Sequence, residues 1–193
     1  MSATTPVLET PRLVLRPPEL ADFERWAELS TDAEATRFIG GVQPRAVAWR
    51  SFAAMVGMWR LTGIAMFSVI EKDSGRWVGR LGPWRPEGWP GTEVGWSLHR
   101  DAWGKGYATE AVKAILAWGD DHFGPVRTVC LISPANSASL RVADKCGFRE
   151  FARHRRVIPV VRRLLADGVT AVGLFEVLCQ DRAGTFLLES AEQ

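Results

Sequence analysis

One strand-to-helix junction, at Gly104 and Gly106, constrains the fold more than any other part of the chain. Residues 93–98 alternate between polar or small and large apolar side chains, which is the pattern of a β-strand. From Ala108 to Leu116 apolar residues recur at a spacing of three and four, which predicts a helix. Backbone N–H groups at the start of such a helix can converge on a pyrophosphate. Alone, the pattern is equally compatible with a tight turn, because it is neither the dinucleotide fingerprint nor the GxxxxGK[ST] loop.

The remaining sequence predicts further strands and helices. Charged and apolar residues alternate at 12–16, and strand-like runs at 66–71 and 77–81 are joined by a short link that ends in glycine, which predicts a hairpin. Helical spacing predicts two helices with one apolar face each. The first face consists of Phe23, Trp26, Ala27 and Ser30, and the second of Trp49, Phe52, Ala53 and Val56. We also expect a strand at 129–132, a short helix capped by Asn136 and stopped by Gly147, a strand from Phe148, and a last strand within 171–179.

Composition limits the classes of protein that fit. A length of 193 residues with 47% hydrophobic and 24% charged residues predicts one globular domain over residues 1–193. The absence of a long apolar run and of an N-terminal leader pattern predicts a cytoplasmic protein without a membrane partner. The three cysteines form no CxxC pair, so we expect neither a zinc nor a redox site, and no metal.

Net charge argues against nucleic acid as a partner. A formal charge of +2 is too small to indicate nucleic-acid binding. Arginines cluster at 153–156 and 162–163, and this cluster is the one feature on which a nucleic-acid-binding module could rest. A solvated surface is the simpler interpretation of such a run.

A second group of residues follows the glycine junction by about thirty positions. The sequence reads WGKGYATEA at 103–111 and NSASLRVADKCGF at 136–148, with EVGW at 93–96 and LETPRL at 8–13. In this combination the chain resembles the GNAT acetyltransferase superfamily, and within it the RimJ/RimL-like group. The resemblance covers residues 8 to 152. A Trp at position 103, where many members have Arg or Gln, is a common variation in that group.

The resemblance implies an α+β fold and a donor substrate. The fold would be a mixed, mostly antiparallel sheet flanked by helices, whose strands near Val94 and Val129 splay to admit the pantetheine of acetyl-CoA. The pyrophosphate would lie on the N–H groups of the glycine loop, at the positive end of the helix dipole. The residues that would contact coenzyme A are Trp96, Ser97, Leu98, Trp103, Gly104, Lys105, Gly106, Tyr107, Ala108, Thr109, Asn136 and Ser139.

The implied activity is acetyl transfer from acetyl-CoA to a primary amine. It requires an amine without its extra proton, a polarised thioester and a way to discharge the thiolate. Many GNAT enzymes supply that last proton from a tyrosine four residues before the Gly-Phe pair, but here the position is Ala143. RimL-like enzymes offer a serine instead, and Ser139 occupies that position. The simpler alternative is that Ser139 only satisfies backbone groups in the first helical turn.

Glu93 is the expected base, directly or through water, because it lies on the opposite face of its strand from Trp96. An ordinary strand-edge carboxylate is the simpler alternative. Glu110 is expected to stabilise the N-terminus of its helix electrostatically rather than to take part in the chemistry. The indoles of Trp84 and Trp89 could line the acceptor pocket, although aromatic residues more often anchor cores and loops.

A non-catalytic module that binds or senses acyl-CoA is the main competing interpretation. Loss of the tyrosine permits it, whereas retention of Glu93, Asn136 and Ser139 argues for an enzyme. The acceptor remains open between a protein N-terminus and a small-molecule amine, and a homodimer is compatible with the resemblance. Residues 154–193 do not match the short closing hairpin of the family.

Overall fold

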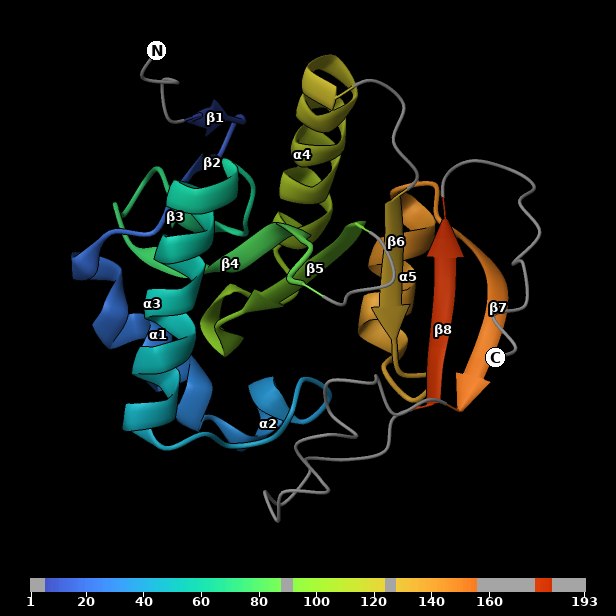
Figure 1. Cartoon of the computed structure of the whole chain (residues 1–193), viewed down its shortest axis with the longest axis horizontal. Helices are drawn as coiled ribbons and strands as arrows, with labels where there is room; N and C mark the ends of the chain where they lie inside the picture. Colours follow the sequence, from blue (N-terminus) through green and yellow to red (C-terminus); the bar gives the residue numbers. More distant parts are fainter. Residues whose placement is uncertain (1–5, 88–91, 124–127, 156–175, 182–193) are drawn as a thin grey trace.

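A single sheet organises the chain in a computed structural model, which describes residues 6–87, 92–123, 128–155 and 176–181 (Figure 1). The described strands are β1 (Leu8–Glu9), β2 (Leu13–Arg16), β3 (Phe67–Glu71), β4 (Trp77–Trp84), β5 (Thr92–Leu98), β6 (Thr128–Ile132), β7 (Arg149–Arg155) and β8 (Glu176–Asp181). They are ordered β1-β2-β3-β4-β5-β6-β8-β7. The described helices are α1 (Phe23–Thr31), α2 (Ala33–Thr36), α3 (Arg45–Thr62), α4 (Tyr107–Phe123) and α5 (Ser137–Lys145), with short 3₁₀ turns η1 (Leu20–Asp22) and η2 (Arg100–Ala102).

Helices cover both faces of this sheet. Consecutive residues of a strand point to opposite faces. Ser68 donates a hydrogen bond to Asp22, at the start of α1, with an oxygen–oxygen distance of 2.7 Å. Its neighbour Phe67 packs edge-on against Trp118 of α4, with ring centroids 5.5 Å apart. Therefore α1 lies on one face and α4 on the other, and α3 packs beside α1 (Figure 1).

The sheet opens between β5 and β6. These strands are parallel and pair at only two positions, Thr92 with Thr128 and Glu93 with Val129. On its other edge β6 pairs with β8 from Val129 to Ile132. All other described pairs are antiparallel. The mixed, mostly antiparallel sheet with splayed central strands is therefore confirmed.

Several local predictions are confirmed and others need correction. The predicted face of α1 is buried, and Asn136 caps α5. The predicted face of α3 is wrong by about one residue, because Trp49 is 45% exposed and the core instead takes Ala48, Phe52, Met55 and Trp59. β4 runs on to Trp84 instead of ending at residue 81. The sequence reading also missed β1 and α2, which are too short to show periodicity.

The last two described strands, β7 and β8, form an antiparallel pair, although residues 154–193 do not resemble the usual closing hairpin. β8 lies between β6 and β7 and pairs with both. The expected last strand, 171–179, is found in part as Glu176–Asp181. The connection from 156 to 175, which includes part of the arginine cluster, lies outside the described residues.

Candidate active site

The glycine loop leads directly into α4. Gly104 and Gly106 have φ angles of 74° and 81°, in the left-handed region that glycine adopts without steric cost. The carbonyl oxygen of Gly106 accepts from the N–H of Glu110 at 3.1 Å, which begins the helical hydrogen bonding. The N–H groups of the first turn have no carbonyl of the helix before them, so they can bind an anion. The loop itself is exposed.

A network from the N-terminal strands holds this loop in place. Arg12 donates to the carbonyl of Lys105 at 2.8 Å and forms an ion pair with Glu110 at 2.6 Å. Thr10 donates to the same carboxylate at 2.6 Å. Partial burial alone would raise the pKa of Glu110, but the hydrogen bonds from Thr10 and Arg12 outweigh it and hold the pKa below its ordinary value. Glu110 therefore ties α4 to the N-terminal strands, a role more specific than the dipole effect expected from sequence.

Tyr107, the only tyrosine, is committed to a structural contact. Its ring is buried, and its hydroxyl donates to Glu71 at an oxygen–oxygen distance of 2.6 Å. Lys105 approaches the same oxygen at 3.3 Å. Hydrogen bonds from Ser74, Tyr107 and Lys105, with Ser74 the largest cause, lower the pKa of Glu71 to about 2. The hydroxyl of Tyr107 therefore joins the start of α4 to the end of β3.

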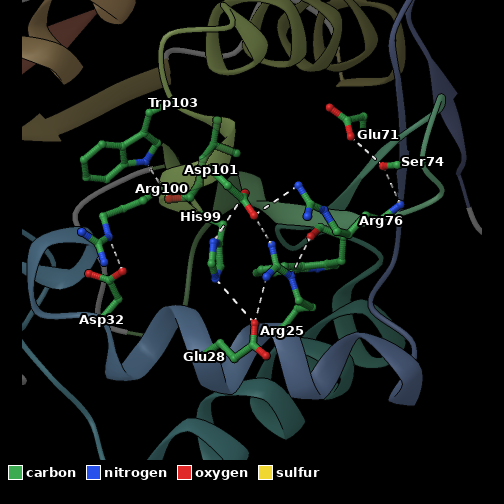
Figure 2. A network of polar contacts seen from close by, with 12 residues as sticks. Arg25, Glu28, Asp32, Glu71, Ser74, Arg76, His99, Arg100, Asp101 and Trp103 are labelled. Carbon is green, nitrogen blue, oxygen red and sulfur yellow. Dashed lines mark hydrogen bonds and ion pairs between the residues drawn. The ribbon is translucent and has the colours of Figure 1, made fainter.

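A cluster of charged side chains lies around the segment that precedes the glycine loop (Figure 2). Arg100 of η2 pairs with Asp32 at the junction of α1 and α2. Arg25 bridges Glu28 and Asp101, at 2.9 Å to each. The depression here, about 660 Å³, is lined by Glu28, Thr31, Asp32, Ala33, Glu34, His99 and Arg100. Since Glu28 and Asp32 are already paired with arginines, we interpret the cluster as a support that positions the segment before the glycine loop.

Trp96 and Ser139 meet across the opening of the sheet. The indole Nε1 of Trp96 donates to Ser139 Oγ at 3.1 Å, which joins β5 to α5. Asn136 Oδ1 accepts from the backbone N–H of Ser139, also at 3.1 Å, as the predicted helix cap. An indole can only donate, so Ser139 Oγ is the acceptor and its own hydrogen can be given to another group. The three residues thus lie together where the sheet opens.

Glu93 lies on the other face of β5. A Cβ placed on Gly95 would be 3.7 Å from Glu93 Oε1 and 2.9 Å from the terminal methyl of Met66. The carboxylate therefore lies beside Gly95, two residues along the same face. Ser139 and Glu93 are consequently placed on opposite faces of β5, with the opening between β5 and β6 beside both.

Trp103 and Leu98 contact each other. The indole of Trp103 donates to the carbonyl of Leu98 at 2.8 Å, which fixes the start of the glycine loop to the end of β5.

The side chain of Trp84 is partly buried, and Trp84 pairs with Glu93 in the register of β4 and β5. Trp89 lies outside the described residues.

The sequence reading missed several supporting residues. Arg12 and Thr10 lie within the LETPRL segment, so the signal was present but its role was not assigned. Glu71 and Arg80 carry no signal, because a charged residue on a strand reads as a solvated face. Within the described ranges no group of three or more His, Cys, Asp or Glu side chains could hold a metal ion. None of the helices described is long and apolar enough to cross a bilayer.

Comparisons with known proteins agree with this arrangement. The Acetyltransferase (GNAT) domain model matches residues 12–149. The uncharacterized N-acetyltransferase p20 of Bacillus licheniformis is 28% identical over 180 residues, which cover 92% of this chain and 98% of p20. A structure from Bordetella pertussis described as a GNAT-family acetyltransferase has a TM-score of 0.72 and 29% identity, over 92% of this chain and 99% of that one.

Two further matches have a narrower meaning. RimL, a ribosomal L7/L12 α-N-protein acetyltransferase solved with coenzyme A, has a TM-score of 0.71 at 14% identity, over 91% of this chain and 96% of RimL, so it shows the shared fold. Anthranilate synthase component 1 of Arthrobacter globiformis is 57% identical over 44 residues, but these are 23% of this chain and 8% of that enzyme. This short match assigns no activity. From the family match over 12–149 we conclude that the chain belongs to the GNAT acetyltransferase family and is an acyltransferase.

Proposed function

We propose that the protein transfers an acetyl group from acetyl-CoA to a primary amine by direct attack within a ternary complex. The observation that carries the proposal is the opening of the sheet after Thr92 and Glu93, with Ser139 and Trp96 in contact across it. A pantetheine arm is narrow enough to lie along the unpaired edge of a strand and to use its free backbone groups. This opening is therefore the place for the thioester.

Coenzyme A would be bound at both ends of that path. Its pyrophosphate would accept hydrogen bonds from the loop of Gly104, Lys105 and Gly106 and from the first N–H groups of α4. Its pantetheine would run beside residues 96–98 and past Asn136. Because Arg12 and Glu110 fix the loop, its N–H groups are already oriented before the ligand binds, which lowers the entropic cost of binding.

The chemistry then uses the two faces of β5. Glu93 takes a proton from the acceptor ammonium group, directly or through water, and the neutral amine attacks the thioester carbonyl. The new C–N bond forms and the oxyanion is stabilised by a backbone N–H of β5. The C–S bond breaks, the attacking nitrogen gives its remaining extra proton to water, and Ser139 donates its hydrogen to the thiolate. Water then reprotonates Ser139.

The contact with Trp96 favours this role for Ser139. A hydroxyl that accepts a hydrogen bond becomes a better donor, because the two bonds polarise each other. Thiols have a pKa of about 8.5, so the departing thiolate requires only modest help. A serine whose oxygen already accepts from an indole is sufficient for that step.

Mass spectrometry can test the proposal and identify the acceptor. The protein is incubated with labelled acetyl-CoA and cell lysate, and peptides and metabolites are analysed separately for labelled acetamides. We expect labelled products with the wild type and fewer with Glu93→Gln. Binding of coenzyme A without thiol release or labelled product from any amine would contradict the proposal and favour the non-catalytic acyl-CoA-binding module.

A further inference from the structure

Arg80, on the face of the sheet that α1 covers, is a cation with no anionic partner among the residues that the structure describes. It lies in β4, and its guanidinium stacks over the ring of Trp26 in α1, 4.2 Å from the ring centroid. Its Nε atom is buried without a hydrogen-bond partner, and no ion pair joins it to any residue that the structure describes. Burial, with no opposing charge nearby, lowers the pKa of Arg80 to about 10.

Ser97 is a second unsatisfied group directly opposite Arg80. The two residues are partners in the antiparallel register of β4 and β5. Side chains of such a pair point to the same face, with Cβ atoms about 5 Å apart. The hydroxyl of Ser97 is buried and has no hydrogen-bond partner within the described ranges. Two groups able to donate hydrogen bonds are therefore placed side by side, and the described part of the chain offers them no acceptor.

An anion would satisfy both groups. Leaving buried donors unpaired is costly, and a guanidinium matches a carboxylate through two parallel hydrogen bonds. The phosphates of coenzyme A would lie at the start of α4, whereas Arg80 contacts α1 on the opposite face. The anion is therefore expected to belong to the acceptor.

The position along β5 limits how far this anion lies from the reacting amine. Ser97 and Glu93 share one face, separated by Gly95. Strand geometry places Ser97 about 7 Å from Gly95 along the chain. An amine that attacks beside Gly95 can thus have its carboxylate at Ser97 only if the two groups are separated by one or a few bonds, as in an α-amino acid.

We propose that Arg80 and Ser97 bind the carboxylate of the acceptor, and that the acceptor belongs to the class of α-amino acids. This inference rests on the proposed acetyl transfer, because it places the amine beside the thioester. Trp26 would hold the guanidinium flat and orient its edge toward the ligand. The amine of a protein N-terminus or of a polyamine lacks an adjacent carboxylate and would leave Arg80 and Ser97 unpaired.

Ligand binding tests the site without relying on turnover. The probes are N-acetyl derivatives of the standard α-amino acids and the matched N-acetyl amides, titrated by calorimetry into protein saturated with coenzyme A. We expect at least one acid to bind roughly 10-fold or more tightly than its amide, because the amide lacks the charge that Arg80 recognises. Equal binding of every acid and its amide, or binding of neither, would overturn the inference.

Variants connect that preference to the two residues. Arg80→Gln and Ser97→Ala should each reduce the preference for the acid over the amide. Affinity for coenzyme A should stay unchanged, because pantetheine would use the backbone of residue 97 and not its side chain. Ser97→Ala removes only an unpartnered hydroxyl and should fold normally even where Arg80→Gln is unstable. Arg50→Gln, an exposed arginine of α3, is the matched control and should keep the preference. A folded Ser97→Ala protein with the full preference would contradict the proposal.

Turnover with the free amino acids and their amides separates this inference from the proposed function. Acetylation of acids and amides at equal kcat/KM would leave acetyl transfer standing and reject the carboxylate site. Selective binding of the acids without acetylation of any amine would support the carboxylate site and reject the proposed acetyl transfer. A higher kcat/KM for the acids, reduced mainly through KM in Ser97→Ala, supports both, because a binding group far from the thioester acts chiefly on affinity.

Discussion

Trp96 donates a hydrogen bond to Ser139 where the sheet opens between β5 and β6, from the indole Nε1 to the hydroxyl oxygen at 3.1 Å. The two residues come from β5 and α5 and are separated by 43 positions in the chain. The contact thus connects the strand that would bind pantetheine with the hydroxyl that would protonate the departing thiolate.

Replacing Ser139 with Ala should lower kcat while leaving acetyl-CoA binding nearly intact. The helix cap uses the backbone N–H of Ser139 and survives the change. A general acid contributes 10²-fold or more, but a thiolate needs little help, so we expect a loss of about 10- to 100-fold in kcat. Steady-state kinetics and calorimetry measure both quantities. Trp96→Phe should show a smaller loss in kcat, and full activity in Ser139→Ala would exclude the proposed role.

A methyl group on Gly106 should weaken binding of coenzyme A. The φ angle of 81° makes alanine unfavourable there, and the new Cβ would lie 3.5 Å from Arg12. Gly63→Ala is a suitable control, since Gly63 has a similar φ of 71°, ends α3 and has open space around it. Both variants should lose about 1–2 kcal/mol of stability. Only Gly106→Ala should lose affinity for coenzyme A in calorimetry; equal affinities would reject the loop as the phosphate site.

The sequence was sufficient where one local pattern determines the structure. Apolar spacing alone predicts the buried stripe of α1, and in the structure its large residue Trp26 packs on Trp77 of the sheet. In α3 the same rule selected a stripe that is right at Phe52 but wrong at Trp49, whose ring contacts Phe23 at the surface and is 45% exposed. Periodicity gives the spacing of a helix face, but tertiary packing decides between two adjacent apolar stripes.

The candidate site was predictable only in part for the same reason. The glycine loop and the cap at Asn136 are local, so their residues carry the signal. The contact between Trp96 and Ser139 depends on how the sheet opens, and the pairing of Arg80 with Ser97 depends on strand register. Neither follows from spacing along the chain.

Asn136 should contribute to both stability and cofactor binding. Its side chain accepts from the N–H of Ser139 and satisfies one free donor at the start of α5. Asn136→Ala should reduce the free energy of unfolding by about 1 kcal/mol, as measured by chemical denaturation. Asn136→Ser should restore most of this stability because serine is an equally good cap. Coenzyme A affinity that stays low in Asn136→Ser would show that the amide also contacts pantetheine, whereas full recovery would limit it to the cap.

Glu71 should stabilise the fold down to low pH. Its pKa is lowered from 4.5 to about 2 in the folded chain, mainly by the hydrogen bonds from Ser74 and Tyr107. A carboxylate with a lowered pKa contributes stability that is complete above its unfolded pKa and is lost as pH falls toward the folded value. The difference in unfolding free energy between wild type and Glu71→Gln should therefore be constant near neutral pH and shrink between pH 4.5 and about 2. Glu87→Gln, which removes an exposed carboxylate, is the control, and a difference that does not vary with pH would contradict this role.

Neither buried cysteine should carry the acetyl group. Burial raises the pKa of Cys130 well above its ordinary value, and the nearby Glu93 and Cys146 raise it further, so its thiolate is disfavoured. Cys146 is buried after α5, and its sulfur lies 3.8 Å from the carbonyl oxygen of Thr109. The thiolate is the nucleophilic form of cysteine, so both residues are poor candidates for covalent catalysis. Cys130→Ala and Cys146→Ala should therefore keep kcat close to that of the wild type. Intact-protein mass spectrometry during turnover should show no added acetyl group, and an acetylated cysteine that disappears when amine is added would instead establish a covalent intermediate.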